Sequence, residues 1–237
     1  MEYQLKNLNI ETKNGKIVSI SNNLTKTQTY RKNFIESLIG KKVLAISKGL
    51  GKMNGFCSIN GNSLTNKFCQ TMKKTESICK KCYSDKFLSF RGSARNRFEL
   101  NDLFISNFIL DKKDLPIIDA TYFRFNGFGE LINQNHLINI VNICDDNPQT
   151  NFSLFTKRLD IVTSVFSSIK KPKNLKIVFS NSKIDNILTE NPIHCDKVFN
   201  VVSVDQDSIN CKGSCINCLK CYSPKYDNTK TIIEKLK

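Results

Sequence analysis

The chain contains no tryptophan and only two histidines and five prolines among its 237 residues. The two histidines, His136 and His194, leave few candidates for a histidine-rich zinc enzyme or a catalytic triad, and we interpret both as structural or surface residues. No apolar run is long enough to span a membrane, and residues 1–20 lack the apolar segment of a signal peptide. We therefore expect a cytoplasmic protein without a membrane partner.

Acidic residues are also scarce, because 21 aspartates and glutamates oppose 36 lysines and arginines and leave a formal net charge of +15. The densest basic stretch, from Lys67 to Arg97, contains nine basic residues against Glu76 and Asp85. Such a charge attracts phosphate backbones, anionic surfaces and acidic proteins without selecting among them. A nucleic acid or an anionic host factor is the candidate partner, and a solvated lysine face is the commoner origin of such a charge.

Cysteine, by contrast, is abundant, since the chain has ten. In a reducing compartment, repeated thiols are more often metal ligands or catalytic groups than disulfides. The positions of the cysteines therefore direct the search for a site.

The pattern of apolar residues predicts an α/β protein. Tyr3 to Ile10 and Lys16 to Ile20 flank Asn14-Gly15, which indicates a β-hairpin, and Tyr30 to Ile39 is expected to form a helix. After a short strand from Lys42 to Ile46, residues 47–86 are expected to form a long functional loop. Strands are then expected at 116–125, 151–155, 175–179 and 197–204, and helices at 93–110, 137–143 and 161–169.

Strands that alternate with helices form parallel sheets with right-handed crossovers. We expect a parallel sheet, open or, as we favour, rolled into a partial (β/α) barrel, with an N-terminal β-hairpin and cysteine-rich metal-binding loops. The expected parts are residues 1–40 (hairpin and helix), 41–205 (α/β core with the cysteine-rich loop) and 206–237 (cysteine-rich metal-binding segment and tail). In such folds the chemistry lies at the carboxyl ends of the strands.

The sharper cysteine signal lies near the C-terminus. Four thiols fall within eleven residues there: Cys211, Cys215, Cys218 and Cys221. Thiols at such short intervals can converge on one centre, and Gly213 and Ser214 keep the first gap small and flexible. Tetrahedral zinc and a four-iron cluster both accept this set, so that spacing alone does not decide between them, and unligated surface thiols are the other interpretation.

A looser cluster lies in the long loop. It comprises Cys57, Cys69, Cys79 and Cys82, followed by Tyr83. Cys79 and Cys82 form a chelating pair that Cys69 or Cys57 joins by folding back, whereas a zinc ribbon would combine the pair with two terminal cysteines. We favour an iron–sulfur centre, of the [4Fe–4S] type, over zinc, and we interpret Cys144 and Cys195 as core residues.

A glycine-rich turn, RFNGFGE (residues 124–130), follows the predicted strand around Phe123. Glycines let the backbone approach a ligand closely, and Glu130 would lie at the carboxyl end of the strand. The simpler interpretation is a turn followed by an acid that complements the dipole of the next helix.

The order of these parts resembles that of radical S-adenosylmethionine enzymes: cysteines after the first core strand, then a helix, then an acidic glycine turn after the second strand. The resemblance implies that Cys69, Cys79 and Cys82 hold a four-iron cluster with one open iron. It also implies that S-adenosylmethionine is bound by Tyr83, Gly127, Gly129, Glu130 and Lys157, and that Glu130 and Arg124 are the catalytic candidates.

A closer resemblance covers about Ser47 to Ser223. Its motifs are SKGLGKM (residues 47–53), CKKCY (79–83), RFNGFGE (124–130), FTK (155–157) and the terminal cysteine cluster. With these motifs the chain resembles the phage family known as gene product 88. The resemblance implies a phage or prophage origin and a location in the host cytoplasm, and it carries no established reaction.

Two functions follow from these observations. One is a radical S-adenosylmethionine-like iron–sulfur enzyme that modifies a nucleic acid or another anionic substrate. The other is a non-catalytic protein, stabilised by zinc or an iron–sulfur cluster, that binds a nucleic acid or a host factor. The order of the cysteine loop and the acidic turn favours the enzyme.

Overall fold

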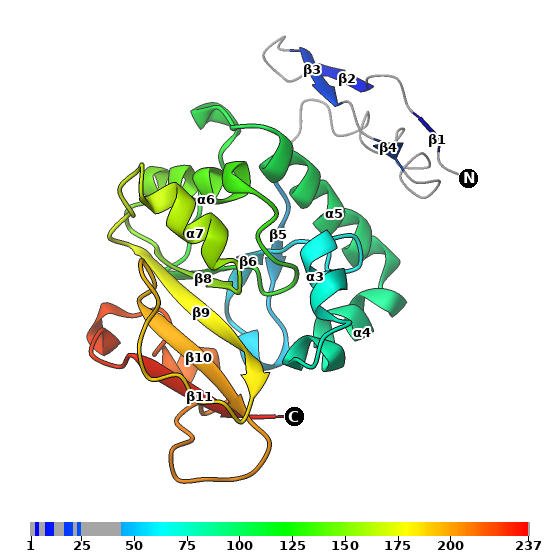
Figure 1. Ribbon diagram of the computed structural model, residues 1–237. Helices are drawn as coiled ribbons and strands as arrows, with labels where there is room; N and C mark the ends of the chain where they lie inside the picture. The colour runs from blue at the N-terminus through cyan, green and yellow to red at the C-terminus, as the bar shows by residue number, and fades with distance from the viewer. Residues whose placement is uncertain (1–2, 5–7, 12–16, 21–22, 25–43, 237) are drawn as a thin grey trace. The chain divides into compact units, whose positions relative to one another are not determined.

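The computed structural model describes residues 3–4, 8–11, 17–20, 23–24 and 44–236, and the chain divides into two units, residues 1–43 and 44–237 (Figure 1). In the first unit β2 (Leu8–Glu11) pairs antiparallel with β3 (Ile17–Ile20), which confirms the predicted hairpin. A second short pair joins β1 (Tyr3–Gln4) to β4 (Asn23–Leu24). The turn at Asn14-Gly15 and the predicted helix at 30–39 lie outside the described residues.

The second unit is built on one seven-stranded sheet whose strands follow one another in chain order. The strands are β5 (Ile46–Lys48), β6 (Cys57–Ile59), β7 (Tyr122–Phe125), β8 (Asn151–Thr156), β9 (Leu175–Ile184), β10 (Lys197–Val202) and β11 (Thr231–Lys235). β5 is antiparallel to β6, and all the other neighbours are parallel. The described strands form an open sheet with β5 and β11 at its edges.

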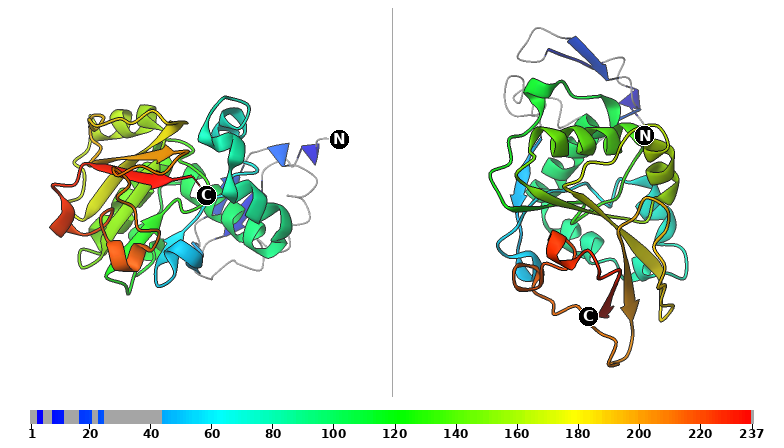
Figure 2. Two further views of the ribbon diagram at one scale, coloured as in Figure 1. Left: turned by 90° about the horizontal axis from the view of Figure 1, so that it is seen from below. Right: turned by 90° about the vertical axis from the view of Figure 1, so that its left-hand side faces the viewer.

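Helices fill the crossovers of the first half of the sheet. They are α3 (Lys67–Met72), α4 (Tyr83–Phe90), α5 (Gly92–Asn107), α6 (Gln134–Asp146) and α7 (Leu159–Phe166). Because the crossovers from β7 to β8 and from β8 to β9 advance across the sheet in the same direction, right-handed connections place α6 and α7 on the same face. Figures 1 and 2 show α6 and α7 on one side of the sheet and the orange-to-red C-terminal segment, with α8 (Cys215–Cys218), on the other.

The local sequence explains why α6 forms where it does. Asn133 precedes the helix, and its side-chain oxygen accepts a hydrogen bond from the backbone N–H of His136 at 3.1 Å. Leu137, Ile140 and Cys144 follow at spacings of three and four residues, and all three are completely buried. The helix therefore starts at an amide cap and is held to the sheet by one apolar face.

The two faces of the sheet differ in chemistry, as alternation along β7 shows. Phe123 and Phe125 point to the helix-covered face, where both are fully buried and contact the ring of Phe152. Arg124 points to the opposite face, where its guanidinium lies 3.9 Å from the centre of the Phe155 ring. One face is thus an aromatic core, and the other carries a cation.

Several sequence expectations were wrong in detail. Residues 47–86 are not one long loop, because they contain β6, α3 and α4. The predicted strand at 116–125 is confined to β7, since Asn147 binds the backbone of Ile118 (2.7 Å) and Pro116 (3.0 Å) and holds that segment away from the sheet. No described helix separates β9 from β10, and β11 was not foreseen.

Candidate functional site

The first cysteine cluster lies on the segment that follows β6, at the carboxyl end of the sheet. Cys69 is in α3, whose cap Asn66 accepts a hydrogen bond from the Cys69 N–H at 3.1 Å. Cys79 is in a short 3₁₀ helix (Ile78–Lys81) capped by Ser77, and Cys82 immediately precedes α4. Each of the three cysteines is therefore fixed by the end of a short helical element.

These three thiols share one electrostatic environment with Glu130. The pKa of Cys69 is raised, first by burial and then by the negative charges of Glu130, Cys82 and Cys79. Burial likewise raises the pKa of Cys82, and Cys79 adds to that increase. The structure thus brings together Cys69, Cys79, Cys82 and Glu130, which the sequence analysis assigned to one site.

Hydrogen bonds join the cysteine segment directly to the RFNGFGE turn. The Gly61 N–H donates to the Phe128 carbonyl at 3.0 Å, and the Asn66 side chain donates to the Glu130 carbonyl at 2.9 Å. The Tyr83 hydroxyl donates to the Gly127 carbonyl, and its ring packs against Phe128 with centroids 5.5 Å apart. Two segments more than forty residues apart in the chain are therefore one structural unit.

The two glycines of the turn are required by this contact. Gly129 has a φ of +79°, and a Cβ there would lie 2.7 Å from the carbonyl carbon of Gly61. At Gly127 a Cβ would lie 2.8 Å from the side-chain oxygen of Asn60. Both glycines thus have a role in packing the two segments together, independent of any ligand.

Glu130 is a buried carboxylate held by the end of β8. Its Oε1 accepts hydrogen bonds from the Leu131 N–H at 2.8 Å and from the Thr156 hydroxyl at 2.5 Å. Its Oε2 accepts from the Lys157 N–H at 2.8 Å. Burial raises the pKa of Glu130, and the charge of Lys157 opposes that increase. Because α6 begins at Gln134 behind its own cap Asn133, Glu130 connects β7 to β8 and does not cap the helix.

Arg124 and Lys157 lie close to different partners. The Arg124 Nη1 donates to the Met53 sulfur at 3.4 Å, on the side of the sheet that carries the terminal cysteines. The Lys157 amino group donates to the Ser180 hydroxyl at 2.8 Å, while its backbone holds Glu130. Of these two cations, Lys157 is the one joined to the first cysteine site.

The terminal cysteines surround a separate small cavity. Its volume is about 20 Å³, and its lining comprises Lys52, Arg124, Phe155, Phe199, Cys211, Ser214, Cys215, Cys218, Leu219, Lys220, Cys221, Tyr222 and Ile232. Cys211 and Cys221 also pack against the apolar cluster of Val178, Phe199 and Ile232. All four terminal thiols therefore belong to one site on the face of the sheet opposite α6 and α7.

Three cysteines lie outside both clusters: Cys57, which was predicted as a metal ligand, and Cys144 and Cys195, which were predicted as core residues. Cys57 lies within β6, where its Cα pairs with those of Lys48 and Phe123, away from the carboxyl end of the strand. Cys144 is completely buried in α6. Cys195 is half-buried before β10, and burial raises its pKa to about 12.

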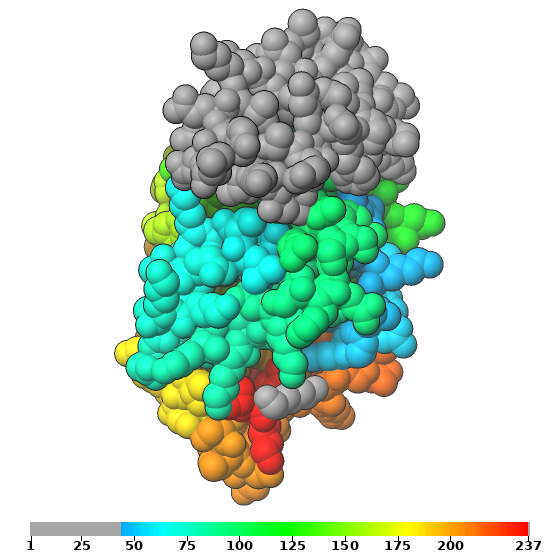
Figure 3. Space-filling model, turned by 90° about the vertical axis from the view of Figure 1, so that its right-hand side faces the viewer, coloured from blue at the N-terminus to red at the C-terminus, as the bar shows by residue number. Residues whose placement is uncertain are grey.

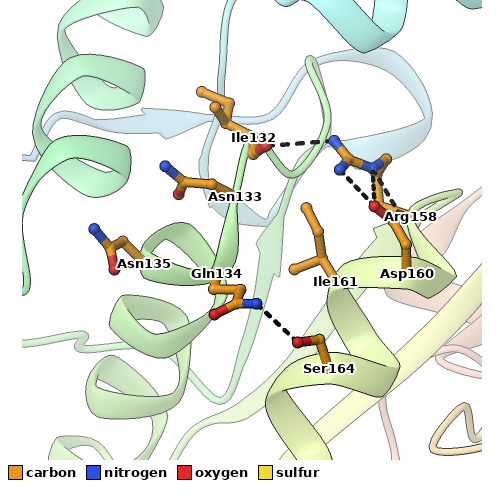
Figure 4. Close-up of a pocket in the computed structure, with 8 residues that line it drawn as sticks. All are labelled: Ile132, Asn133, Gln134, Asn135, Arg158, Asp160, Ile161 and Ser164. Carbon is orange, nitrogen blue, oxygen red and sulfur yellow. Dashed lines mark hydrogen bonds and ion pairs between the residues drawn. The ribbon is translucent and has the colours of Figure 1, made fainter.

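A larger hollow lies beside the turn, between the beginnings of α6 and α7 (Figure 4). It has a volume of about 390 Å³ and is lined by Ile132, Asn133, Gln134, Asn135, Arg158, Asp160, Ile161 and Ser164. Arg158 is paired with Asp160 at 2.6 Å and donates to the carbonyls of Leu131 and Ile132. No cysteine lines this hollow, and its one cation is neutralised by its own neighbour.

Sequence reasoning missed the asparagines that assemble the first site. Asn60 bonds the Phe128 N–H at 3.1 Å, Asn62 bonds Glu99 and Asp102, and Asn66 bonds Glu130. All three are buried and directly follow β6. A run of asparagines after a strand was the available signal, but the short β6 went unrecognised.

Among the described residues, no group of three or more His, Cys, Asp or Glu side chains is arranged to hold a metal ion as it stands. The thiols of each cluster are neighbours without converging on one point. Within the same part of the chain, every helix is too short or too polar to cross a membrane.

The fold and the two thiol clusters define an α/β protein with one cysteine-rich segment at the carboxyl end of its sheet and another on the face opposite α6 and α7. A family model described as gene product 88 matches residues 18–220. The chain therefore belongs to the gene product 88 family, a family of phage proteins. Searches of curated proteins and of solved structures gave no significant match.

Proposed function

We propose that this protein holds an iron–sulfur cluster on Cys69, Cys79 and Cys82 and uses it in chemistry of the radical S-adenosylmethionine type. The observation that carries the proposal is the direct contact between the cysteine segment and the turn that ends in Glu130. Three thiolates would leave one iron of a four-iron cluster without a protein ligand, and that iron would be free to bind a cofactor. Such a cluster, when bound and reduced, would supply the electron that cleaves a sulfonium.

The residues of this chain would bind and orient the cofactor. Glu130 has one remaining acceptor position on Oε2, because that oxygen accepts only the Lys157 N–H in the described structure. A cofactor amino group would be its complement. Tyr83, which is 63% exposed, would present its ring edge beside the Gly127 carbonyl.

The proposed fold of the site is a partial (β/α) barrel. The chain order of the six parallel strands supports this proposal, in which the site would lie at the carboxyl ends of the strands. The host cytoplasm, with its reducing conditions, is the proposed location, because it keeps the thiols available for a metal.

An anionic substrate, and a nucleic acid in particular, is supported by the surface around the first cluster. Figure 3 shows that face, where side chains from α3, α4 and α5 form the cyan and green surface. The exposed cations in the segment that contains α3 and α4 include Lys67, Lys74, Lys81, Lys86 and Arg91. Phe90, which is 82% exposed, adds an aromatic ring on which a base could stack.

The terminal segment is the other place where an open cluster could be sought. Cys211, Cys215 and Cys218 have gaps of three and two residues, the spacing usual in this enzyme class. Cys221 lines the same cavity and supplies a fourth thiol, which would close the coordination of a cluster there. We therefore assign the open site to the first cluster.

The test uses the full chain, purified and reconstituted with iron and sulfide without oxygen. The reduced protein is expected to contain acid-labile sulfide and to convert S-adenosylmethionine to 5′-deoxyadenosine and methionine. Cys82→Ala should abolish this conversion and remove iron from the first site. Glu130→Gln should retain the iron and weaken cofactor binding, because a contact to the cofactor is lost and not a metal ligand.

A double change of Cys215 and Cys218 to serine is the matched control, since it removes thiols from the other face of the sheet. Protein that holds a reducible cluster on Cys69, Cys79 and Cys82 but neither binds nor cleaves S-adenosylmethionine would overturn the enzymatic proposal. Colourless protein with zinc and no sulfide would overturn the iron–sulfur proposal as well.

A non-catalytic binding protein is the second candidate. It is favoured because the residues of the turn have structural roles that need no ligand. Gly127 and Gly129 allow the close packing of the two segments, and the Glu130 Oε1 accepts two hydrogen bonds from within the protein. In that case the metal would only stabilise the basic face that binds nucleic acid. Binding of an oligonucleotide that persists unchanged in Glu130→Gln, without any cofactor turnover, would favour this candidate.

A further inference from the structure

The environment of the terminal cysteines carries more information than their spacing. The cavity that they surround is lined by three cations, Lys52, Arg124 and Lys220, and by no aspartate or glutamate. Positive charges that face a cavity without carboxylates require an anion for their stabilisation. The question is which anion the site is built to hold.

Of the three cations, Arg124 gives the strongest argument for a bound anion. Among the described residues it forms no ion pair, and its Nε is completely buried without a hydrogen-bond partner. The guanidinium interacts with the sulfur of Met53 at 3.4 Å, with the face of the Phe155 ring at 3.9 Å and, through a hydrogen bond, with the side chain of Tyr222. A guanidinium whose partners are a thioether, an aromatic ring and a phenol hydroxyl lacks the charged partner that such a group normally has when it is buried.

The two lysines differ in whether a carboxylate compensates their charge. The Lys52 amino group is paired with Glu234 at 2.7 Å, whereas within the described part of the chain Lys220 donates only to the Asn210 carbonyl at 2.9 Å. Of the three cations at the cavity, one therefore has a carboxylate and two do not. The uncompensated charge is two positive units.

We infer that Cys211, Cys215, Cys218 and Cys221 form a closed metal–tetrathiolate centre with a net charge of −2, and that Arg124 is its internal counter-ion. Four thiolates around Zn²⁺ carry this charge, and so do four thiolates around a [4Fe–4S]²⁺ cluster. Either centre would neutralise the two uncompensated cations. This inference does not rest on the proposed function, because it concerns other thiols on the opposite face of the sheet.

The cavity in its described form favours the smaller of these centres. A volume of about 20 Å³ is close to the space that one water molecule needs, about 10–15 Å³ on the same measure. A single metal ion fits there once the four thiols turn inward, whereas a four-iron cluster requires residues 211–221 to move outward. Ligand binding that reorganises its own loop is usual for thiolate sites, because metal binding is coupled to folding.

The first experiment measures zinc, iron and acid-labile sulfide in the full chain. We expect the wild type to contain one metal centre more than the variant in which Cys215 and Cys218 are both changed to serine, in addition to the cluster proposed for Cys69, Cys79 and Cys82. The same centre should remain in Cys82→Ala and in a thiol control with Cys144→Ala and Cys195→Ser. One zinc per chain identifies the single-ion form, and four irons with sulfide at these cysteines identify the cluster form.

The second experiment tests Arg124 as the counter-ion. Release of the terminal metal to a chelator is expected to be about 10- to 100-fold faster in Arg124→Gln than in the wild type, as for other outer-shell partners of metal ligands. Arg124→Lys should restore slow release, because it returns the charge. Lys170→Gln removes an equal charge from an exposed position and should leave the rate unchanged.

Two outcomes would overturn the inference. Terminal cysteine variants that retain all their metal would show that these thiols are not ligands. A release rate in Arg124→Gln equal to that of the wild type would show that the guanidinium does not stabilise the centre. If Arg124→Gln does not fold, cobalt substitution of Cys82→Ala still tests the ligand set, because the intensity of thiolate-to-cobalt charge transfer increases with the number of bound thiolates and should correspond to four.

Discussion

Asp102 is a carboxyl group buried beneath the first cysteine segment. Its Oδ2 accepts the Asn62 N–H at 2.7 Å, and its Oδ1 has no partner within the described part of the chain. Burial raises its pKa from 3.8 to about 7, the Asn62 N–H opposes that increase, and the charge of Glu99 adds to it. A group of this kind makes the stability of the folded chain depend on pH.

The sign of that dependence follows from proton binding. Between the unfolded pKa of 3.8 and the folded pKa of about 7, the folded protein retains a proton that the unfolded chain gives up. The free energy of unfolding therefore falls as pH rises through this window, by no more than about 4 kcal/mol in total. Asp102→Asn should remove this loss, so that its stability relative to the wild type increases with pH.

Urea unfolding between about pH 5 and pH 8 measures this difference. The exposed residue Asp119 provides the control, because Asp119→Asn removes a carboxyl group without a burial cost. A difference between Asp102→Asn and the wild type that stays constant across this range would contradict the prediction.

At the scale of elements, the decisive feature is the contact between the segment after β6 and the turn after β7. Gly129 makes it possible, because its φ is +79° and a Cβ would lie within 2.9 Å of three backbone atoms of Gly61. Gly129→Ala should therefore lower the free energy of unfolding by about 2 to 4 kcal/mol, through backbone strain and overpacking. Metal retention at Cys69, Cys79 and Cys82 should fall with it.

Gly92 offers a matched glycine in the same unit. It begins α5, and the nearest atom to a Cβ there is the Arg95 Nη2 at 3.9 Å. Gly92→Ala should change the free energy of unfolding by less than about 1 kcal/mol, and in the stabilising direction. Urea unfolding measures the free energy of unfolding of both variants. A Gly129→Ala protein as stable as the wild type would contradict the prediction, because it would show that the two segments can move apart at little cost.

The same contact marks the limit of what the sequence predicted. Apolar periodicity located α5, α6, α7, β8, β9 and β10, because long or repeated patterns specify an element by themselves. β6 has three residues, Cys57–Ile59, and neither their number nor their polarity sets them apart from a loop. The cysteines lie close to Glu130 because β6 and β7 are neighbouring strands. No local pattern in the sequence indicates that pairing, so the proximity was predicted only from the resemblance to radical S-adenosylmethionine enzymes.

The terminal site illustrates the same limit on the other face of the sheet. The spacing of its cysteines predicted one cluster, and the structure places all four around one cavity. The roles of Lys52, Arg124 and Tyr222 could not be read from the sequence, since they come from η1 (Gly51–Met53), β7 and the segment after α8. Residues that meet only through the sheet register leave no local pattern.

At the scale of the whole molecule, the net charge of +15 does not by itself specify a partner. A defined binding face differs from non-specific electrostatic attraction in that the cations at one place on the surface contribute more to affinity than equal charges elsewhere. Lys74, Lys81 and Lys86 are exposed around the first cysteine cluster, and Lys170, Lys173 and Lys230 are exposed elsewhere on the same unit. These two sets carry equal charge and allow a matched comparison.

If the cysteine face binds single-stranded nucleic acid, changing the first set to alanine should weaken binding of an oligonucleotide more than changing the second set. Each lost phosphate contact reduces the slope of log affinity against log salt by about 0.7, so that the first set should reduce it by about 2. The second set should leave the slope nearly unchanged, because its lysines contribute only to the long-range potential, which salt screens. Fluorescence anisotropy over a salt series measures both slopes, and equal reductions would mean that the charge attracts polyanions without a defined face.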